Sequence, residues 1–524
     1  MKKSAFTLIA LLTVLITSAQ LNMQQLGKLP YSNELSDIWA YADGNGNEYA
    51  LVGVYNGLSI VNVTDPSNPV EVFFGSGPNS VWRDIKTWGH YAYVSNENTG
   101  GVYIVDLSPL PGSVTSTTNF TGTIFPFTSA HNLFIDETGK LYIFGADNGA
   151  GGAIICDLTI DPMNPVELGR VNSFYLHDGM ARGDTLWGAA IYQGFLASID
   201  VSDPANPQLM GSKTTPGQFT HNTWVSDNSK YVFTTDEVSG GFLGAYDVTN
   251  LSNIVEVGKV QSSPGSGVIP HNVHFINDFI VTSYYTDGVT IHDVSRPDNI
   301  ILVGHFDTSP TYSGSGFHGC WGVYPWLPSG NILATDIEEG LYILQADYPK
   351  AFHVNGLAVD SVSGDLLFNV QYEVLGTNIS GATLFNGTFK FGTLETGSYD
   401  IQFTKEGYQA KVLESVEFVN GGFLELEVKM ASEIFTGMKS FTEDISINLY
   451  PNPFQSSFSL ELVNNMNGPT RIEIFDLTGQ VVESHTLSGN SPSLSTGVAL
   501  KPGLYFIRIT NQMGATRTER VVKH

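Results

Sequence analysis

The sequence predicts an all-β protein: a seven-bladed β-propeller followed by two small β-sandwich domains. A short phrase at the head of a strand recurs seven times between Asp37 and Gly319, at intervals of 47, 48, 46, 44, 50 and 47 residues. A repeat of about 40 to 50 residues built from short strands is typical of a propeller blade. Because every blade presents its first strand to a common axis, residues far apart in sequence can line one opening.

Each repeat contains signals for four strands. Apolar runs rich in β-branched and aromatic residues, such as 91–95 and 102–106, alternate with glycine-containing turns and therefore favour strands over helices. A rigid turn such as Asp65–Pro69 follows the third strand, because proline presets the backbone dihedral and Asn or Asp can bond the local backbone. A short run such as 166–169 then supplies the fourth strand.

The seventh repeat lacks a fourth strand, because its third strand at 341–344 runs directly into Asp347-Tyr348-Pro349. The segment 25–29, which precedes the first repeat, resembles the fourth strand at 167–171. The sequence therefore predicts that the N-terminal strand completes the last blade and closes the ring without an exposed sheet edge.

The N-terminus reads as a secretory signal peptide at residues 1–19. Lys2 and Lys3 precede the apolar stretch 5–16, and small residues stand before Gln20. The stretch is too short to span a bilayer, and the rest of the chain offers no candidate transmembrane segment. We therefore expect an exported chain whose propeller occupies residues 20–347.

The composition excludes one class of partner. The chain holds 24 Lys and Arg against 51 Asp and Glu, a net charge of −27. Nucleic acid is therefore not expected as a ligand, because phosphate binding needs clustered basic residues. Cys156 and Cys320 fall in blades that are not neighbours, so two buried free thiols are expected instead of a disulfide.

Residues 348–431 change character to longer alternating strands. A Gly-Ser-Tyr at 397–399 followed by Lys-Glu-Gly-Tyr at 405–408 resembles the carboxypeptidase-regulatory-like fold, a transthyretin-type β-sandwich. That resemblance implies a spacer or an added binding module. Residues 432–446 read as a polar linker.

Residues 447–524 carry four motifs in order, at 449–454, 472–479, 502–508 and 520–523. They resemble the C-terminal sorting domain of the type IX secretion system. The resemblance implies that the secretion machinery is a partner of this region. It also implies a Gram-negative bacterium as the source, and the outer-membrane surface or the extracellular space as the location.

The propeller resembles the LVIVD-repeat proteins and, within them, the choice-of-anchor B family. The resemblance rests on Ser-Ala-His-Asn at 129–132, Tyr-Leu-His-Asp at 175–178, Phe-Thr-His-Asn at 219–222, the strand 102–106 and the Asp-Pro-x-Asn-Pro turns. No activity is implied by this resemblance.

Histidines are the candidate site, because five of the seven phrases carry one. We expect these five to converge at one channel mouth, with carboxylates one strand later; the predicted metal-binding set is His131, His177, His221, His271, His318, Asp147 and Asp236. Imidazole with carboxylate is a plausible donor set for a divalent transition metal. Glu97, Glu237 and Asp336 occupy comparable turns. The alternative is that each histidine only hydrogen-bonds backbone and fixes one blade to the next.

Two classes of function follow. The first is a non-enzymatic surface protein that binds an extracellular glycan, polymer or protein at the mouth of the propeller. The second is a metal-dependent hydrolase or oxidoreductase that uses the histidines. Binding is favoured, because the sequence shows no complete catalytic constellation and a fold alone does not indicate an enzyme.

Overall fold

The computed structural model describes residues 20–433, 445–463, 468–487, 493–512 and 516–524. The signal peptide predicted at 1–19 lies outside the described residues. All regular secondary structure in the described residues is β-strand. No helix in this part of the chain is long and apolar enough to cross a membrane. The chain divides into two compact units, one ending at Ala351 and the other beginning at Phe352.

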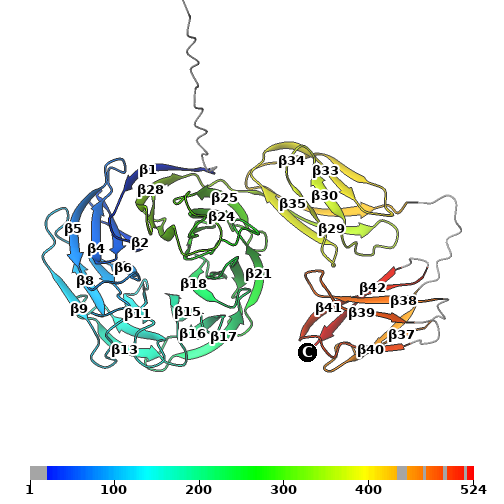
Figure 1. The fold of residues 1–524 in the computed structure, drawn as a ribbon, viewed down its shortest axis with the longest axis horizontal. Helices are drawn as coiled ribbons and strands as arrows, with labels where there is room; N and C mark the ends of the chain where they lie inside the picture. Colours follow the sequence, from blue (N-terminus) through cyan, green and yellow to red (C-terminus); the bar gives the residue numbers. More distant parts are fainter. Residues whose placement is uncertain (1–19, 434–444, 464–467, 488–492, 513–515) are drawn as a thin grey trace, which may run out of the picture. The chain divides into compact units, whose positions relative to one another are not determined.

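The first unit is a β-propeller. Its described residues form seven four-stranded antiparallel sheets, which follow one another around a ring (Figure 1). We number these blades one to seven in chain order. In blades one to six the four strands are consecutive in the sequence, and the first strand of each is innermost and contacts the first strand of its neighbour.

Blades one to three consist of β2 (Leu35–Ala42), β3 (Glu48–Val54), β4 (Gly57–Asn62), β5 (Val70–Ser76); β6 (Ile85–Trp88), β7 (Tyr91–Val94), β8 (Val102–Asp106), β9 (Thr117–Phe120); and β10 (Asn132–Ile135), β11 (Lys140–Phe144), β12 (Ala153–Asp157), β13 (Val166–Val171). Blades four to six consist of β14 (Asp178–Arg182), β15 (Thr185–Ala190), β16 (Phe195–Asp200), β17 (Gln208–Thr214); β18 (Thr220–Val225), β19 (Tyr231–Asp236), β20 (Leu243–Asp247), β21 (Val255–Val260); and β22 (Val273–Ile276), β23 (Phe279–Ser283), β24 (Val289–Asp293), β25 (Ile301–Phe306). Blade seven consists of β26 (Cys320–Tyr324), β27 (Ile332–Asp336), β28 (Gly340–Ala346) and β1 (Met23–Leu29).

The N-terminal strand closes the ring, as the sequence predicts. β1 pairs antiparallel with β28, from Met23 opposite Ala346 to Leu29 opposite Leu341. It is the outermost strand of blade seven, in the order β1-β28-β27-β26. The last blade is therefore built from both ends of the propeller sequence.

Glycines in the outer strands make room for the rigid turns of the neighbouring blades. A Cβ atom placed on Gly169 would lie 1.7 Å from the carbonyl oxygen of Pro204, in the turn of the next blade. A Cβ on Gly27 of β1 would lie 1.8 Å from the carbonyl of Pro66 in the same way. Only glycine lets the neighbouring turn approach so closely. The equivalence of Gly27 and Gly169 also confirms that β1 fills the place of a fourth strand.

The core of the propeller lies between the sheets and consists mainly of aliphatic and aromatic side chains from the inner three strands of each blade. Cys156 and Cys320 belong to it as buried free thiols, which confirms the expectation for both cysteines.

The second unit contains two sandwiches of two sheets each. In residues 352–430 the sheets have the orders β32-β29-β35 and β31-β30-β33-β34; the strands are β29 (Phe352–Asp360), β30 (Gln371–Val374), β31 (Ser380–Ala382), β32 (Thr388–Thr393), β33 (Gly397–Thr404), β34 (Lys411–Phe418) and β35 (Phe423–Met430). In the C-terminal region the orders are β36-β37-β40 and β39-β38-β41-β42; the strands are β36 (Ile447–Tyr450), β37 (Phe458–Leu462), β38 (Thr470–Phe475), β39 (Val481–Leu487), β40 (Ser493–Thr496), β41 (Gly503–Thr510) and β42 (Thr516–Lys523). Each encloses its own buried apolar cluster.

Candidate functional site: the ring of residues around the propeller channel

One residue of each blade occupies the same place at the head of the innermost strand. We call these residues the ring positions: Ser36, Arg83, His131, His177, His221, His271 and Trp321. Hydroxyls on second strands identify several of them, because each donates a hydrogen bond to the carbonyl of the ring position in the following blade: Ser95 to His131 (2.8 Å), Thr235 to His271 (2.5 Å), Ser283 to Trp321 (2.8 Å) and Thr335 to Ser36 (2.6 Å).

In blades one, two and five the residue after the ring position binds the backbone of the next blade. The carboxylate of Asp84 accepts the backbone N–H of Leu133 in blade three at 2.9 Å. The amide oxygen of Asn222 likewise accepts the N–H of Val273 in blade six at 3.0 Å. These bonds satisfy buried backbone donors at the junction between two blades. Ring assembly therefore accounts for Asp37, Asp84 and Asn222 among the Asp and Asn residues that recur in the sequence.

Four histidines stand side by side at successive ring positions. The ring centroids of His131 and His177 are 4.0 Å apart, those of His177 and His221 are 4.2 Å apart, and those of His221 and His271 are 4.4 Å apart. We call these four residues the histidine row. The convergence of these four imidazoles is as the sequence predicts.

Hydrogen bonds to the next blade orient the row. Nδ1 of His177 lies 3.3 Å from the carbonyl oxygen of His221, and Nδ1 of His221 lies 3.2 Å from that of His271. Nδ1 of His271 lies 2.5 Å from the carbonyl oxygen of Trp321. A carbonyl only accepts, so each Nδ1 carries the proton and each Nε2 keeps its lone pair. His177, His221 and His271 therefore fix one blade to the next, as the alternative interpretation held for all five histidines, and remain available as ligands through Nε2.

A small cavity of about 20 Å³ lies among the ring positions. Its walls are formed by the histidine row together with Asp37, Trp82, Arg83, Asp84, Asn132, Asn272 and Trp321. A polar space of this size holds about one water molecule or one ion.

Glu237 lies at one end of the row. Its two carboxylate oxygens lie 3.7 Å from Nε2 of His221 and 3.8 Å from Nε2 of His271. These distances are too long for hydrogen bonds, so three donors face a shared gap. His221, Glu237 and His271 are the one group among the described residues whose potential ligand atoms all lie within 4.8 Å of one another.

Tyr285 positions Glu237. Its hydroxyl donates a hydrogen bond of 2.7 Å to the Glu237 carboxylate, and its ring lies 4.8 Å from that of His271. The backbone of Tyr285 has a φ of +43°, which is rare for a bulky residue and costs energy. The fold therefore holds a strained residue where it can orient a carboxylate against two imidazoles.

Glu97 lies at the other end, with an oxygen 3.1 Å from Nδ1 of His131. Burial lowers the pKa of His131, but the hydrogen bond and charge of Glu97 outweigh it, so the pKa is raised above its ordinary value. The row thus ends in a glutamate on each side, and the imidazole paired with Glu97 is the one that favours a proton.

The rest of the row stays neutral. Burial and, secondly, the neighbouring imidazoles hold the pKa of His177 well below its ordinary value. Burial lowers the pKa of His221 and of His271 to about 3, with further lowering from the neighbouring histidines. A neutral imidazole is the form that binds a metal ion.

Two predicted carboxylate ligands lie elsewhere. Asp147 accepts hydrogen bonds from Thr128 and from the N–H of Ser129, and Asp236 accepts them from Thr215 and the N–H groups of Gly217 and Phe219. Neither forms an ion pair or hydrogen bond with a histidine among the described residues. The physical reason is the alternation of side chains in extended backbone: Asp236 caps its loop, and the next residue, Glu237, faces the histidine row.

The expectation for His318 was also wrong. Nδ1 of His318 lies 2.6 Å from the carboxylate of Glu338, and its ring stacks on Tyr312 at 4.1 Å. Its side chain is 47 % exposed, and it does not line the cavity. The ring position of blade seven is Trp321, three residues later, because the bulge that marks His221 in β18 falls between Cys320 and Gly322 in β26.

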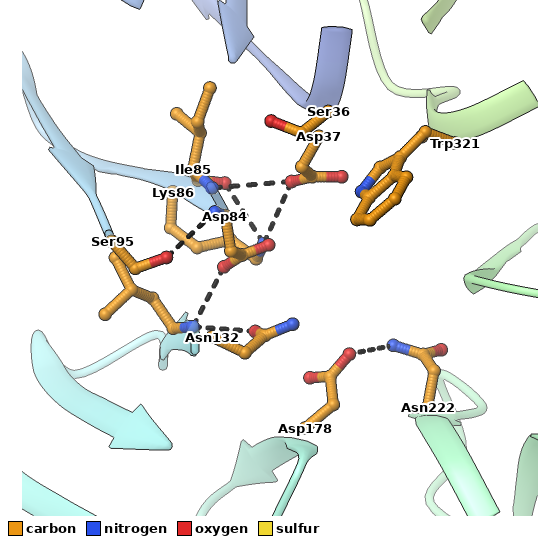
Figure 2. A network of polar contacts seen from close by, with 12 residues as sticks. Ser36, Asp37, Asp84, Ile85, Lys86, Ser95, Asn132, Asp178, Asn222 and Trp321 are labelled. Atoms are coloured by element: carbon orange, nitrogen blue, oxygen red, sulfur yellow. Dashed lines mark hydrogen bonds and ion pairs between the residues drawn. The ribbon is translucent and has the colours of Figure 1, made fainter. Parts of the chain in front are cut away.

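A second polar cluster, which sequence reasoning missed, consists of side chains one to three residues after the ring positions of blades one, two and four (Figure 2). Nζ of Lys86 lies 2.7 and 2.9 Å from the carboxylate oxygens of Asp84 and 3.8 Å from that of Asp37. Asp178 accepts a hydrogen bond of 2.5 Å from the Asn222 amide. We call Asp37, Asp84, Lys86 and Asp178 the acid–lysine cluster. All four are buried.

Burial governs the protonation of the acid–lysine cluster. It raises the pKa of Asp178 to about 7, with a further contribution from the charge of Asp84. The pKa of Asp37 is raised well above its ordinary value, first by burial and then by Asp84. Burial lowers the pKa of Lys86, but the charges of Asp84, Asp37 and Asp178 outweigh that and raise it. The alternation that puts Asp84 and Lys86 on one face, two residues apart, could have been recognised in the sequence.

Comparison with known proteins identifies two parts of the chain. A family model described as the LVIVD repeat matches residues 36–74, 82–113 and 190–215, and one described as the secretion system C-terminal sorting domain matches residues 448–524. No curated protein matches the chain. The chain thus contains LVIVD repeats and a type IX sorting domain, which indicates export to the cell surface or the extracellular space.

Solved structures similar to this chain include β-propellers. The Cps50 (Swd1) β-propeller domain of Myceliophteria thermophila is 12 % identical, with a TM-score of 0.45; the alignment covers 62 % of this chain and 100 % of that one. A computationally designed protein, Ika8, is 9 % identical with a TM-score of 0.41, and the alignment again covers 62 % and 100 %.

Proposed function

We propose that this chain is an exported, non-enzymatic binding protein whose propeller holds a divalent transition-metal ion, with zinc as the best fit, at the end of the histidine row. The proposed ligands are Nε2 of His221, Nε2 of His271 and the carboxylate of Glu237. The observation that carries the proposal is the gap between these three donors, whose oxygen–nitrogen separations are 3.7 and 3.8 Å.

The donor geometry supports an ion. Two donors about 2.1 Å from a tetrahedral zinc ion are roughly 3.4 Å apart. The oxygen–nitrogen separations of 3.7 and 3.8 Å are close to this value, and all three donor atoms lie within 4.8 Å of one another. The donors are also prepared: Nδ1 of each histidine is bound to a carbonyl, and Glu237 is bound by Tyr285. Such outer contacts fix the orientation and the tautomer of metal ligands.

A metal-dependent hydrolase is the second candidate, because three protein donors leave one coordination position for water, as in catalytic zinc sites. The cavity of about 20 Å³ that His221 and His271 line holds a water molecule or an ion, which suits the binding of an ion; Glu237 does not line it.

The test is a zinc titration of the full chain by calorimetry, with the metal content of the purified protein measured in parallel. We expect near-stoichiometric zinc binding by the wild type. His221→Ala and Glu237→Gln should each weaken binding by at least about 100-fold, because losing a ligand costs more than the 10- to 100-fold typical of an outer contact.

The matched control is His318→Ala. His318 is a half-exposed histidine paired with Glu338. It belongs to the recurring phrase of blade seven but lies outside the cavity. Its removal should leave zinc affinity unchanged. Equal weakening by His318→Ala and His221→Ala, or a wild type that binds no zinc, would contradict the proposal. Zinc-dependent turnover of an ester or peptide substrate would favour the hydrolase.

We further infer how the propeller reaches its place of action. The proposed signal peptide at 1–19 directs export across the inner membrane, and residues 447–524 engage the type IX machinery. The middle domain, 348–431, serves as a spacer of the carboxypeptidase-regulatory-like type, and the whole follows the choice-of-anchor B pattern. Deleting 447–524 should retain the chain in the periplasm, as cell fractionation would measure. Surface display without the tail would contradict this inference.

A further inference from the structure

Arg83 is a buried cation without an anionic partner. The residue is 5 % exposed, although it occupies a ring position in an acidic chain. Its Nε donates to the carbonyl of Val54, and its Nη2 donates to the carbonyls of Tyr55 and Pro78. No carboxylate of the described residues forms an ion pair with it, and its hydrogen bonds to described residues involve Nε and Nη2, which leaves the two N–H donors of Nη1 for a ligand.

A cavity of about 70 Å³ lies beside this guanidinium, between blades one and two. Arg83 is the one charged residue in its wall, which also contains Gly75, Gly77, Asn96 and Tyr103. A Cβ atom placed on Gly77 would lie 3.7 Å from Nη1, so the free nitrogen is at the wall of this cavity. The space exceeds the room needed for one water molecule.

We propose that this cavity is a binding site for a carboxylate group of an extracellular ligand, held by Nη1 of Arg83. A monoanion balances the single buried positive charge, and hydrogen bonds from a charged donor to a carboxylate are strong. A dianion would leave excess negative charge in a buried site within a chain of net charge −27. The hydroxyl of Tyr103, which lines the same cavity, supplies a second polar contact.

The site is independent of the metal site. Arg83 also lines the cavity of the histidine row, but its Nε and Nη2 bond the carbonyls of Val54 and Pro78, and none of the three proposed metal ligands lines the cavity between blades one and two. The proposal therefore goes beyond the proposed function and can fail without affecting it. Zinc titration of the variants described below tests the metal site separately from the carboxylate site.

The experiment measures the melting temperature of the full chain at constant ionic strength with two carboxylate probes, N-acetylglycine for a peptide terminus and galacturonate for an acidic sugar. Their neutral counterparts, N-acetylglycinamide and galactose, serve as blanks. We expect a saturable rise of several degrees with a carboxylate probe and none with its blank, because a ligand that binds the native state stabilises it. Whichever probe acts at lower concentration identifies the source of the carboxylate.

Variants locate the effect. Arg83→Gln should abolish the rise in melting temperature. Gly77→Ala should abolish it too while the guanidinium is kept, because the added Cβ fills the space beside Nη1 at ordinary contact distance. Gly77→Ala keeps the test valid if Arg83→Gln does not fold. The matched control is Arg182→Gln, which removes another arginine bound to a carbonyl, that of Ser226. Equal shifts in Gly77→Ala and wild type, or no shift with either probe, would overturn the proposal.

Discussion

The two sides of the propeller ring use the same backbone contacts for different chemistry. In blades three to six the ring positions are histidines; in blades four to six their Nδ1 atoms bind the next blade, and Nε2 of His221 and of His271 faces Glu237 at more than hydrogen-bond distance. At blades one and two the residues after the ring positions, Asp37 and Asp84, belong to the acid–lysine cluster, whose carboxylates pair with Lys86, with backbone N–H groups or, for Asp178 of blade four, with the Asn222 amide. Hydroxyls of the second strands hold the ring carbonyls on both sides, as the bonds from Thr235 to His271 and from Thr335 to Ser36 show.

The difference separates assembly from function. Polar groups that are fully paired in a buried network specify one arrangement of the blades and have no capacity left for a ligand. A row of imidazoles that uses one nitrogen for assembly keeps the other for chemistry. We therefore expect changes in the acid–lysine cluster to act on stability, and changes at the end of the histidine row to act on ligand binding.

The largest effect is expected from Lys86→Met. Removing the ammonium leaves Asp84 and Asp37 buried without their counter-charge, at 5 % and 4 % exposure. Breaking a buried ion pair in this way costs about 3–5 kcal/mol, which urea denaturation of the full chain would measure in the propeller transition.

Lys350→Met is the matched control for that substitution. It removes an exposed pair with Asp278, at 3.0 Å, and should cost less than about 1 kcal/mol. Adding Asp84→Asn to Lys86→Met should recover part of the loss, because a neutral amide can still accept the N–H of Leu133. Equal costs for the Lys86 and Lys350 variants would show that the acid–lysine cluster does not hold the ring together.

The second effect is a pH dependence of stability that arises from Asp178. Its pKa is raised from the ordinary value to about 7, so between these values the folded chain binds more protons than the unfolded chain. Stability should therefore fall as pH rises from 5 toward 7, by on the order of 2 kcal/mol, and then level off. Asp37 adds to this slope in the same direction.

Asp178→Asn should flatten that slope, because an amide does not titrate. The control is Asp200→Asn: Asp200 lies on the surface, and hydrogen bonds from Ser202 lower its pKa, so it is ionised throughout the same range. Denaturation at several pH values between 5 and 8 would measure both variants. An unchanged slope in Asp178→Asn would assign the pH dependence to other groups.

The fold was predictable because its signals are local and repeat. Apolar runs with glycine turns mark each strand, and the likeness between Gly27 and Gly169 indicates closure by the N-terminal strand, which the pairing of β1 with β28 confirms. The histidine row was predictable for the same reason. Four histidines precede an Asn or Asp at matched positions, so a shared axis brings them together.

The rest of the site depends on details finer than the repeat. In blade seven, His318 with the following Gly and Cys resembles the recurring phrase, but the strand bulge places Trp321 at the ring position. One residue decides whether a carboxylate caps a loop or faces the channel, as Asp236 and Glu237 show. The acid–lysine cluster joins three blades, so only the assembled ring shows that Asp178 approaches Lys86.

The smallest effect is expected from His177→Phe, which tests the comparison within the row itself. Nδ1 of His177 bonds the carbonyl of His221, but its Nε2 is not among the three donors around Glu237. Phenylalanine keeps a ring between His131 and His221 and loses one hydrogen bond, so unfolding should cost about 1 kcal/mol less. Zinc affinity should stay within about twofold of the wild type in a calorimetric titration. If His177→Phe instead weakens zinc binding as much as His221→Ala, the ion sits at the middle of the row, and Glu237 is an orienting group without a place among the ligands.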